Sequence, residues 1–203
     1  MGAVYHRRSL RLPEYDYAQA GYYFVTIATY RRTHLFGEVV EGQMVLNMAG
    51  EMVQKWYNKV EDKFPNTQAH EMVIMPNHIH FVIEIIHPVG ADPRVRPLPG
   101  GHKQPQQDFW NQKHPSPIQG QTHGSAPTHT AVTVGGIVQW FKTMTTNTYI
   151  QMVKSAILPP FDRRIWQRNF YEHVIRNDAD YTRIAEYIIH NPLTWQEDIF
   201  ATS

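Results

Sequence analysis

The chain has 203 residues, of which 42% are hydrophobic, and its formal net charge is +1. This length and apolar content suit one core, so we expect residues 1–203 to form a single domain. The lack of cysteine excludes a disulfide framework and a thiolate zinc cluster. No segment has the apolar run of a signal peptide or a membrane span, so we expect a cytoplasmic protein without a membrane partner.

Before residue 87 the sequence predicts three strands and one helix. Residues 21–30, GYYFVTIATY, are β-branched and aromatic, which is typical of a strand. Residues 47–64 predict one amphipathic helix, because apolar residues recur at steps of three and four. Two further strands, 69–75 and 78–86, are joined by the tight turn Pro76-Asn77.

Residues 87–131 have a different composition from the rest of the chain. They contain eight prolines and almost no periodic apolar residues. Such a segment buries too little surface to offset the entropy of ordering it, so we interpret it as a flexible insertion within the domain. Its five histidines are scattered among the prolines, and we interpret them as solvated linker residues.

After the insertion the sequence predicts a helix over 135–153 and a strand within 164–175. A final helix begins at Asn177 or Asp178 and is ended by Pro192. Without the insertion the order is βαββαβ plus this helix. The order predicts an α+β, ferredoxin-like split βαβ fold, in which an antiparallel sheet carries two helices on one face.

Two histidines stand in the stretch MPNHIHFVIEI. Side chains alternate along a strand, so His78 and His80 share one face while Ile79 and Phe81 lie on the other. Two imidazoles at this spacing can hold one divalent ion. The alternative is a half-exposed sheet face that tolerates histidine, and the spacing alone leaves both interpretations open.

The final helix carries a second pair of polar residues. Its core stripe is formed by Tyr181, Ile184, Ala185 and Ile188. Tyr187 lies at the flank of this stripe, and Asn191 follows one turn later on the same side. The alternative interpretation is that Asn191 ends the helix before Pro192 and that Tyr187 is a boundary aromatic residue.

Several blocks together resemble the REP-associated tyrosine transposases, relatives of the single-tyrosine insertion-sequence transposases within the histidine-hydrophobic-histidine endonuclease superfamily. The blocks are RRSLRLPEYDYAQAGYYFVTIAT, HLFGEV, MPNHIHFVIEI, VGGIVQWFK, WQRNFYEHVIRN and YIIHNPLTW. They occur in the family's order and cover most of the chain outside the insertion. The resemblance also implies the fold that the element order predicts.

The resemblance implies a role for each member of the two pairs. Tyr187 would be the nucleophile that attacks a phosphodiester, giving a 5′-phosphotyrosine intermediate and a free 3′-hydroxyl. His78, His80 and Asn191 would hold Mg²⁺ or Mn²⁺; spacing alone equally suggests Zn²⁺. The substrate would be single-stranded DNA with a hairpin. Relatives act as monomers or homodimers, so both states remain open.

Basic residues supply candidate DNA contacts, because they attract phosphate. We name Arg11 near the start of the chain, and Lys142, Arg168 and Arg176 in its second half. The last three have aromatic neighbours suited to stacking unpaired bases, Trp140, Trp166 and Tyr171. The alternative is that these aromatic residues belong to the core, which we favour for Trp140.

Two other functional classes compete with a transposase. A histidine-triad nucleotide hydrolase also uses His-x-His on a strand, but Val82 stands where its third histidine is required. A domesticated, non-catalytic DNA-binding protein would keep the fold and lose the site. His78, His80, Tyr187 and Asn191 are all present, so we favour an active enzyme.

Overall fold

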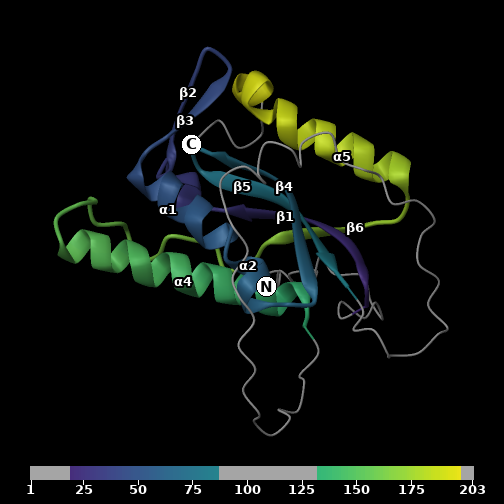
Figure 1. Ribbon diagram of the computed structural model, residues 1–203. Coiled ribbons are helices and arrows are strands. Elements are labelled where there is room, and N and C mark those ends of the chain that lie inside the picture. Colours follow the sequence, from purple (N-terminus) through teal and green to yellow (C-terminus); the bar gives the residue numbers. More distant parts are fainter. Residues whose placement is uncertain (1–18, 87–131, 198–203) are drawn as a thin grey trace, which may run out of the picture. The chain divides into compact units, whose positions relative to one another are not determined.

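The computed structural model describes residues 19–86 and 132–197 (Figure 1). The strands are β1 (Gly21–Ala28), β2 (Gly37–Val40), β3 (Gln43–Leu46), β4 (Thr67–Met75), β5 (His78–Ile85) and β6 (Tyr171–Ile175). The helices are α1 (Met48–Tyr57), α2 (Val60–Lys63), α4 (Val134–Lys154) and α5 (Asp178–His190), with short 3₁₀ helices η1 (Tyr30–Arg32) and η2 (Asn191–Glu197). The predicted insertion, 87–131, and Arg11 lie outside the described residues. No helix within the described ranges is long and apolar enough to cross a membrane.

Four strands form the main sheet in the order β4-β5-β1-β6, and each neighbouring pair is antiparallel. This is the strand order of a split βαβ fold, because the first and third strands of the motif, β1 and β5, pair at the centre. The predicted α+β, ferredoxin-like architecture is therefore confirmed.

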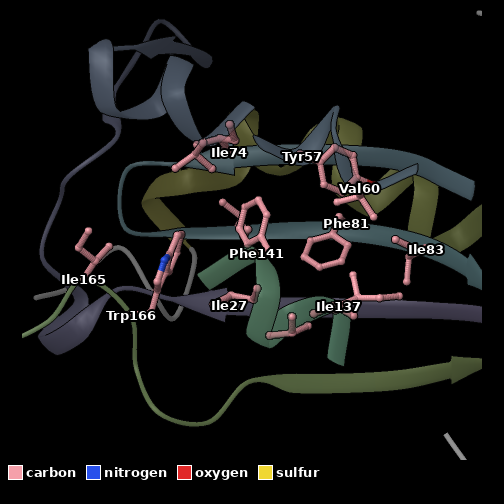
Figure 2. Close-up of a cluster of buried hydrophobic side chains, with 14 of the residues drawn as sticks. Ile27, Tyr57, Val60, Ile74, Phe81, Ile83, Ile137, Phe141, Ile165 and Trp166 are labelled. Atoms are coloured by element: carbon pink, nitrogen blue, oxygen red, sulfur yellow. The ribbon is translucent and has the colours of Figure 1, made fainter. Parts of the chain in front are cut away.

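Helices α1 and α4 cover one face of this sheet. Figure 2 shows buried side chains of the core between the sheet and these helices. The ring centroids of Phe81 on β5 and Phe141 on α4 are 6.4 Å apart. Ile79 and Ile83 point to the same side of β5 and are fully buried. The prediction that the apolar face of this strand lies under the helices is confirmed.

Helix α5 covers the opposite face of the sheet (Figure 1). Its buried residues Ile184 and Ile188 pack in a second, smaller cluster with Phe24, Val82 and Ile175 from β1, β5 and β6. The predicted core stripe of this helix is thus observed. The face that carries His78 and His80 is covered and not half-exposed.

Some predicted elements differ from the observed ones. The helix predicted over 47–64 is interrupted, so that α1 ends at Tyr57 and α2 begins at Val60. The strand predicted within 164–175 begins only at Tyr171, because the preceding segment turns into the core and buries Trp166. Pro192 ends α5, and the chain continues directly as η2.

The hairpin β2–β3 is an element that the sequence analysis missed. Its two-residue turn has Glu41 and Gly42 at positive φ, 51° and 75°, as expected for a tight hairpin. The turn lies against η2, since a Cβ on Gly42 would be 2.8 Å from Leu193 Cδ2. The hairpin therefore supports the segment that follows Asn191.

The first turn of α1 packs closely on the chain before β2. Asn47 caps the helix, with Oδ1 accepting hydrogen bonds from the backbone N–H groups of Ala49 and Gly50 at 2.9 and 3.1 Å. A Cβ on Gly50 would lie 2.3 Å from the carbonyl oxygen of Phe36. Only glycine permits this approach.

We expect Gly50→Ala to lower the free energy of unfolding by about 1–3 kcal/mol, because helix and backbone must move apart. Gly136→Ala in the first turn of α4 is the matched control, since its Cβ would meet only the capping hydroxyl of Thr133, at 3.3 Å. Both changes gain the same helix propensity. Urea unfolding of the two variants measures the difference, and equal stabilities would contradict the close packing of α1.

Candidate functional site

His78 and His80 lie side by side on β5, on the face that α5 covers. Both side chains are buried. β5 is an inner strand, paired with β4 on one side and with β1 on the other. In this register Thr26 of β1 stands directly opposite His80. The alternation predicted from the sequence therefore places both imidazoles in one covered position.

The two rings are held by their Nδ1 atoms and meet through their Nε2 atoms. His78 Nδ1 is 2.9 Å from Asn77 Oδ1, and His80 Nδ1 is 2.7 Å from Thr26 Oγ1. The two Nε2 atoms are 3.0 Å apart. Partners on Nδ1 fix the orientation of an imidazole and leave Nε2 for a ligand. Both Nε2 atoms are therefore directed at one point.

The hydrogen bonds also indicate which nitrogen of a neutral His78 carries the proton. Asn77 donates through Nδ2 to the carbonyl of Arg32 at 3.0 Å, so its Oδ1 accepts the Nδ1–H of His78. A neutral His78 consequently has its lone pair on Nε2. Burial, and then the neighbouring His78, hold the pKa of His80 well below its usual value. His80 is therefore neutral near pH 7.

Tyr187 reaches this pair from α5. Its hydroxyl is 3.2 Å from His80 Nε2, and the two ring centroids are 5.2 Å apart. Its side chain is nevertheless 43% exposed, because Tyr187 lies at the flank of the stripe formed by Ile184 and Ile188. The phenol thus contacts the His80 imidazole, while the residue as a whole stays partly exposed. One chain supplies all three side chains.

Asn191 is buried at the end of α5, one turn after Tyr187. Four residues further on, the Trp195 ring lies 5.9 Å from the ring of His78. The chain therefore contacts His80 before Asn191 and His78 after it. Asn191 also ends α5, as the alternative interpretation of this residue as a helix-terminating residue predicts. Its role as a ligand stays a prediction.

A group of polar residues fixes the first half of α5 to the sheet. We call Tyr22, His70, Glu71, Glu84 and Tyr181 the anchor cluster. Tyr181 donates to Glu71 Oε2 at 2.7 Å and lies 3.3 Å from His70 Nδ1, while His70 Nε2 is 3.1 Å from Glu84 Oε2. Burial, and then Glu84, raise the pKa of Tyr22, which packs edge-on against Tyr181. Such a network positions the helix that carries Tyr187.

A β-bulge in β4 creates the anchor cluster. Ala69 pairs with Ile83 and Met72 pairs with Phe81, so two residues, His70 and Glu71, face a single position on β5. A bulge of this kind turns side chains away from strict alternation. The sequence did not predict the cluster, because a local change of register leaves no mark in the hydrophobic pattern.

The predicted DNA contacts have different surroundings. Lys142 donates to the carbonyls of Gln167, Arg168 and Asn169 at 2.9–3.3 Å, which occupies its three donors, and burial lowers its pKa to about 8. This arrangement indicates that Lys142 holds the segment before β6. Arg168 and Arg176 are exposed, and their DNA contacts stay predictions.

The aromatic neighbours of these basic residues are not equivalent. Trp140 packs edge-on against Trp56 and Phe64, as the core interpretation expects. Trp166 is buried, with Nε1 donating to Thr145 Oγ1 at 2.9 Å, so its interpretation as a stacking residue was wrong. Tyr171 is 44% exposed and remains available for stacking.

The histidine pair fits a divalent metal ion. Two nitrogen atoms 3.0 Å apart can both lie about 2.1 Å from one ion. Within residues 19–86 and 132–197, no group of three or more His, Cys, Asp or Glu side chains could hold a metal. Asn191, which the sequence resemblance names as the third ligand, is buried and stands one turn after Tyr187.

The fold and the site together define an α+β protein of ferredoxin-like strand order with a buried His-x-His pair under a tyrosine-bearing helix. The chain is 36% identical to an uncharacterized protein of Haemophilus influenzae over 195 residues. The aligned region covers 96% of this chain and 93% of that protein. The chain belongs to the same family as that protein. No family profile matches the sequence.

Two solved structures are similar to this chain at low sequence identity. One is a REP-associated tyrosine transposase bound to a REP hairpin, at 20% identity and a TM-score of 0.43, covering 90% of this chain and 74% of that one. The other is a Deinococcus radiodurans R1 protein provisionally described as a transposase, at 11% identity and a TM-score of 0.42. The match covers 88% of this chain and 95% of that one.

We expect the Tyr181–Glu71 hydrogen bond to stabilise the docking of α5. Tyr181→Phe should lower the free energy of unfolding by about 1–3 kcal/mol, because it leaves a carboxylate without its hydroxyl donor. In a double-mutant cycle with Glu71→Gln, measured by urea unfolding, the two costs should be clearly less than additive. Additive costs would show that the two side chains do not interact.

Proposed function

We propose that this protein is a metal-dependent single-stranded DNA endonuclease and strand transferase, a transposase-type enzyme. One observation supports this proposal above the others: the Tyr187 hydroxyl is 3.2 Å from His80 Nε2, which is itself 3.0 Å from His78 Nε2. A nucleophile and a metal-binding pair are thus close enough to act on one phosphate. The sequence blocks shared with REP-associated tyrosine transposases support the same reaction.

In this proposal Tyr187 attacks the phosphorus atom of a phosphodiester. The Oη–P bond forms as the bond from phosphorus to the leaving 3′ oxygen breaks, which gives a 5′-phosphotyrosine and a free 3′-hydroxyl. The phenol has an ordinary pKa of about 10 and must lose its proton during attack. In this proposal the proton passes to solvent, because Tyr187 is an exposed residue at the flank of α5.

His78, His80 and Asn191 would hold Mg²⁺ or Mn²⁺ at this site. When bound, the ion supplies charge stabilisation for the phosphate oxygens in the transition state. The two histidines are prepared for this role, since their Nδ1 atoms are engaged by Asn77 and Thr26. Rings oriented in advance need little rearrangement to bind a ligand.

The phosphotyrosine bond conserves the energy of the cleaved phosphodiester. A 3′-hydroxyl of another strand can therefore attack it, so that cleavage becomes strand transfer without ATP. The substrate is DNA that carries a hairpin next to a single-stranded segment. One chain supplies Tyr187, His80 and His78, so in this proposal a monomer carries out the cleavage step.

Covalent attachment to DNA is the first test. With Mn²⁺ and labelled hairpin-bearing single strands from the surrounding genomic sequence, we expect a protein–DNA adduct that survives denaturation. Tyr187→Phe should abolish the adduct, because it removes the attacking oxygen. Tyr30→Phe is the control, since the Tyr30 ring packs on Arg164 and keeps this contact in the variant. An adduct that persists in Tyr187→Phe would exclude Tyr187 as the nucleophile.

Hairpin binding without any adduct would instead favour a non-catalytic DNA-binding protein.

Metal binding can be measured without any reaction. An ion that binds only the folded state at 100 times its Kd adds about 2.7 kcal/mol to stability, so Mn²⁺ should raise the Tm of the wild-type protein. His78→Ala, His80→Ala and Asn191→Ala should each lose most of this rise. His190→Ala is the matched control, because His190 is exposed on α5. An equal rise in all variants would place the ion elsewhere.

A further inference from the structure

A cavity of about 470 Å³ opens beside the candidate site, and both Tyr187 and His80 contribute to its wall. It lies between α5, β1 and β6 on the sheet face away from α4. Its size falls within the range of small-ligand sites, about 300–1,000 Å³. The proposed cleavage chemistry uses only the tyrosine edge of this cavity, so the remaining walls need another explanation.

Aromatic rings form most of these walls. Phe24 is stacked on His80, with centroids 5.3 Å apart and an interplanar angle of 23°. Tyr171 and Tyr187 meet Phe24 edge-on at 6.3 and 6.2 Å. Tyr171 is 44% exposed, so one of its faces is accessible to a ligand. Accessible aromatic faces of this kind stack well on unpaired nucleobases.

The rim of the cavity is polar and includes the guanidinium of Arg183. His173 and Arg183 line it, and both bond to Asp180, His173 Nε2 at 2.9 Å from Asp180 Oδ2. The hydrogen bond from His173, followed by that from Arg183, lowers the pKa of the Asp180 carboxyl. The Arg183 side chain is 69% exposed and has five N–H donors. Its pairing with Asp180 therefore leaves donors directed to solvent.

The geometry points to a base-binding site: the cavity receives one unstacked nucleobase of a nucleotide that flanks the phosphate held at Tyr187, with Arg183 facing the adjoining phosphate. This inference rests on the proposed function. Tyr171 provides the stacking surface, Phe24 closes the wall beside it, and the half-buried His173 offers a polar ring to the edge of the base. A stacked duplex cannot enter such a cavity, because the base must first leave the stack.

The test uses the full-length Tyr187→Phe protein, so that binding is measured without cleavage. The probe is a hairpin-bearing single strand in which one abasic nucleotide is placed in turn at each position of the single-stranded segment. At one position the missing base should weaken binding by about 5- to 150-fold, the range of base–aromatic stacking. In Tyr187→Phe/Tyr171→Ala the same abasic strand should bind within about twofold of the intact strand.

A second variant separates the charge from the stacking. Arg183→Ala should weaken binding of every strand and reduce the salt dependence of binding. Lys63→Ala is the control and should change neither, because Lys63 is an exposed residue on α2 and does not line the cavity. Both Tyr171 and Arg183 are exposed enough for their variants to fold. Abasic effects of equal size with and without Tyr171, or no sensitive position at all, would overturn the base-binding site.

The outcomes distinguish this inference from the proposed function. If the wild-type protein forms the phosphotyrosine adduct but no abasic position depends on Tyr171, the base-binding site fails and the proposed function stands. If one position depends on Tyr171 but no adduct forms, the base-binding site stands and the proposed catalysis fails. Absence of any DNA binding would overturn both.

Discussion

The site depends on the register between β1 and β5. This register places Thr26 opposite His80 and joins Oγ1 to Nδ1 at 2.7 Å. A shift of one residue would move both histidines to the face under α1 and α4, because side chains alternate along a strand. The apolar residues Ile79, Phe81 and Ile83 prevent such a shift, since it would expose them to the polar face. Hydrophobic packing on one face therefore fixes the polar chemistry on the other.

Helix α5 gives this polar face its low accessibility without closing it. Ile184 and Ile188 bury the centre of the helix, while Tyr187 stays at the open flank. The imidazoles are desolvated, which keeps His80 neutral and ready to bind a ligand. The helix is held at one end by the anchor cluster and at the other by η2 against the hairpin. Its position is thus specified by contacts on both sides of the tyrosine.

Much of the fold could be predicted from the sequence, because its main elements follow strong periodic signals. The alternation in MPNHIHFVIEI placed the histidines on one face, and the three- and four-residue steps of the last helix placed Tyr187 near its flank. That the two meet could not be derived from periodicity. It depends on the packing angle of α5 and on the bulge at His70 and Glu71, and both of these arise only in three dimensions.

The features that the sequence did not predict, the hairpin β2–β3 and the contacts of Lys142, have physical reasons too. The strands β2 and β3 have four residues each, too few for alternation to rise above chance, and Gly42 between them was the one hairpin signal in the sequence. Lys142 looked like a surface charge in the sequence. Its carbonyl partners come from residues 167–169, which are distant along the chain, so only the folded structure shows that its donors are occupied.

The contact between Gly42 and Leu193 links a surface turn to the end of the tyrosine helix. Residues near position 42 are more than 140 positions away from Asn191 in the chain, yet they press on the turn that follows it. Random mutagenesis screened for loss of function should therefore return changes at the tip of this hairpin. Without the folded structure, such hits would look unrelated to the chemistry.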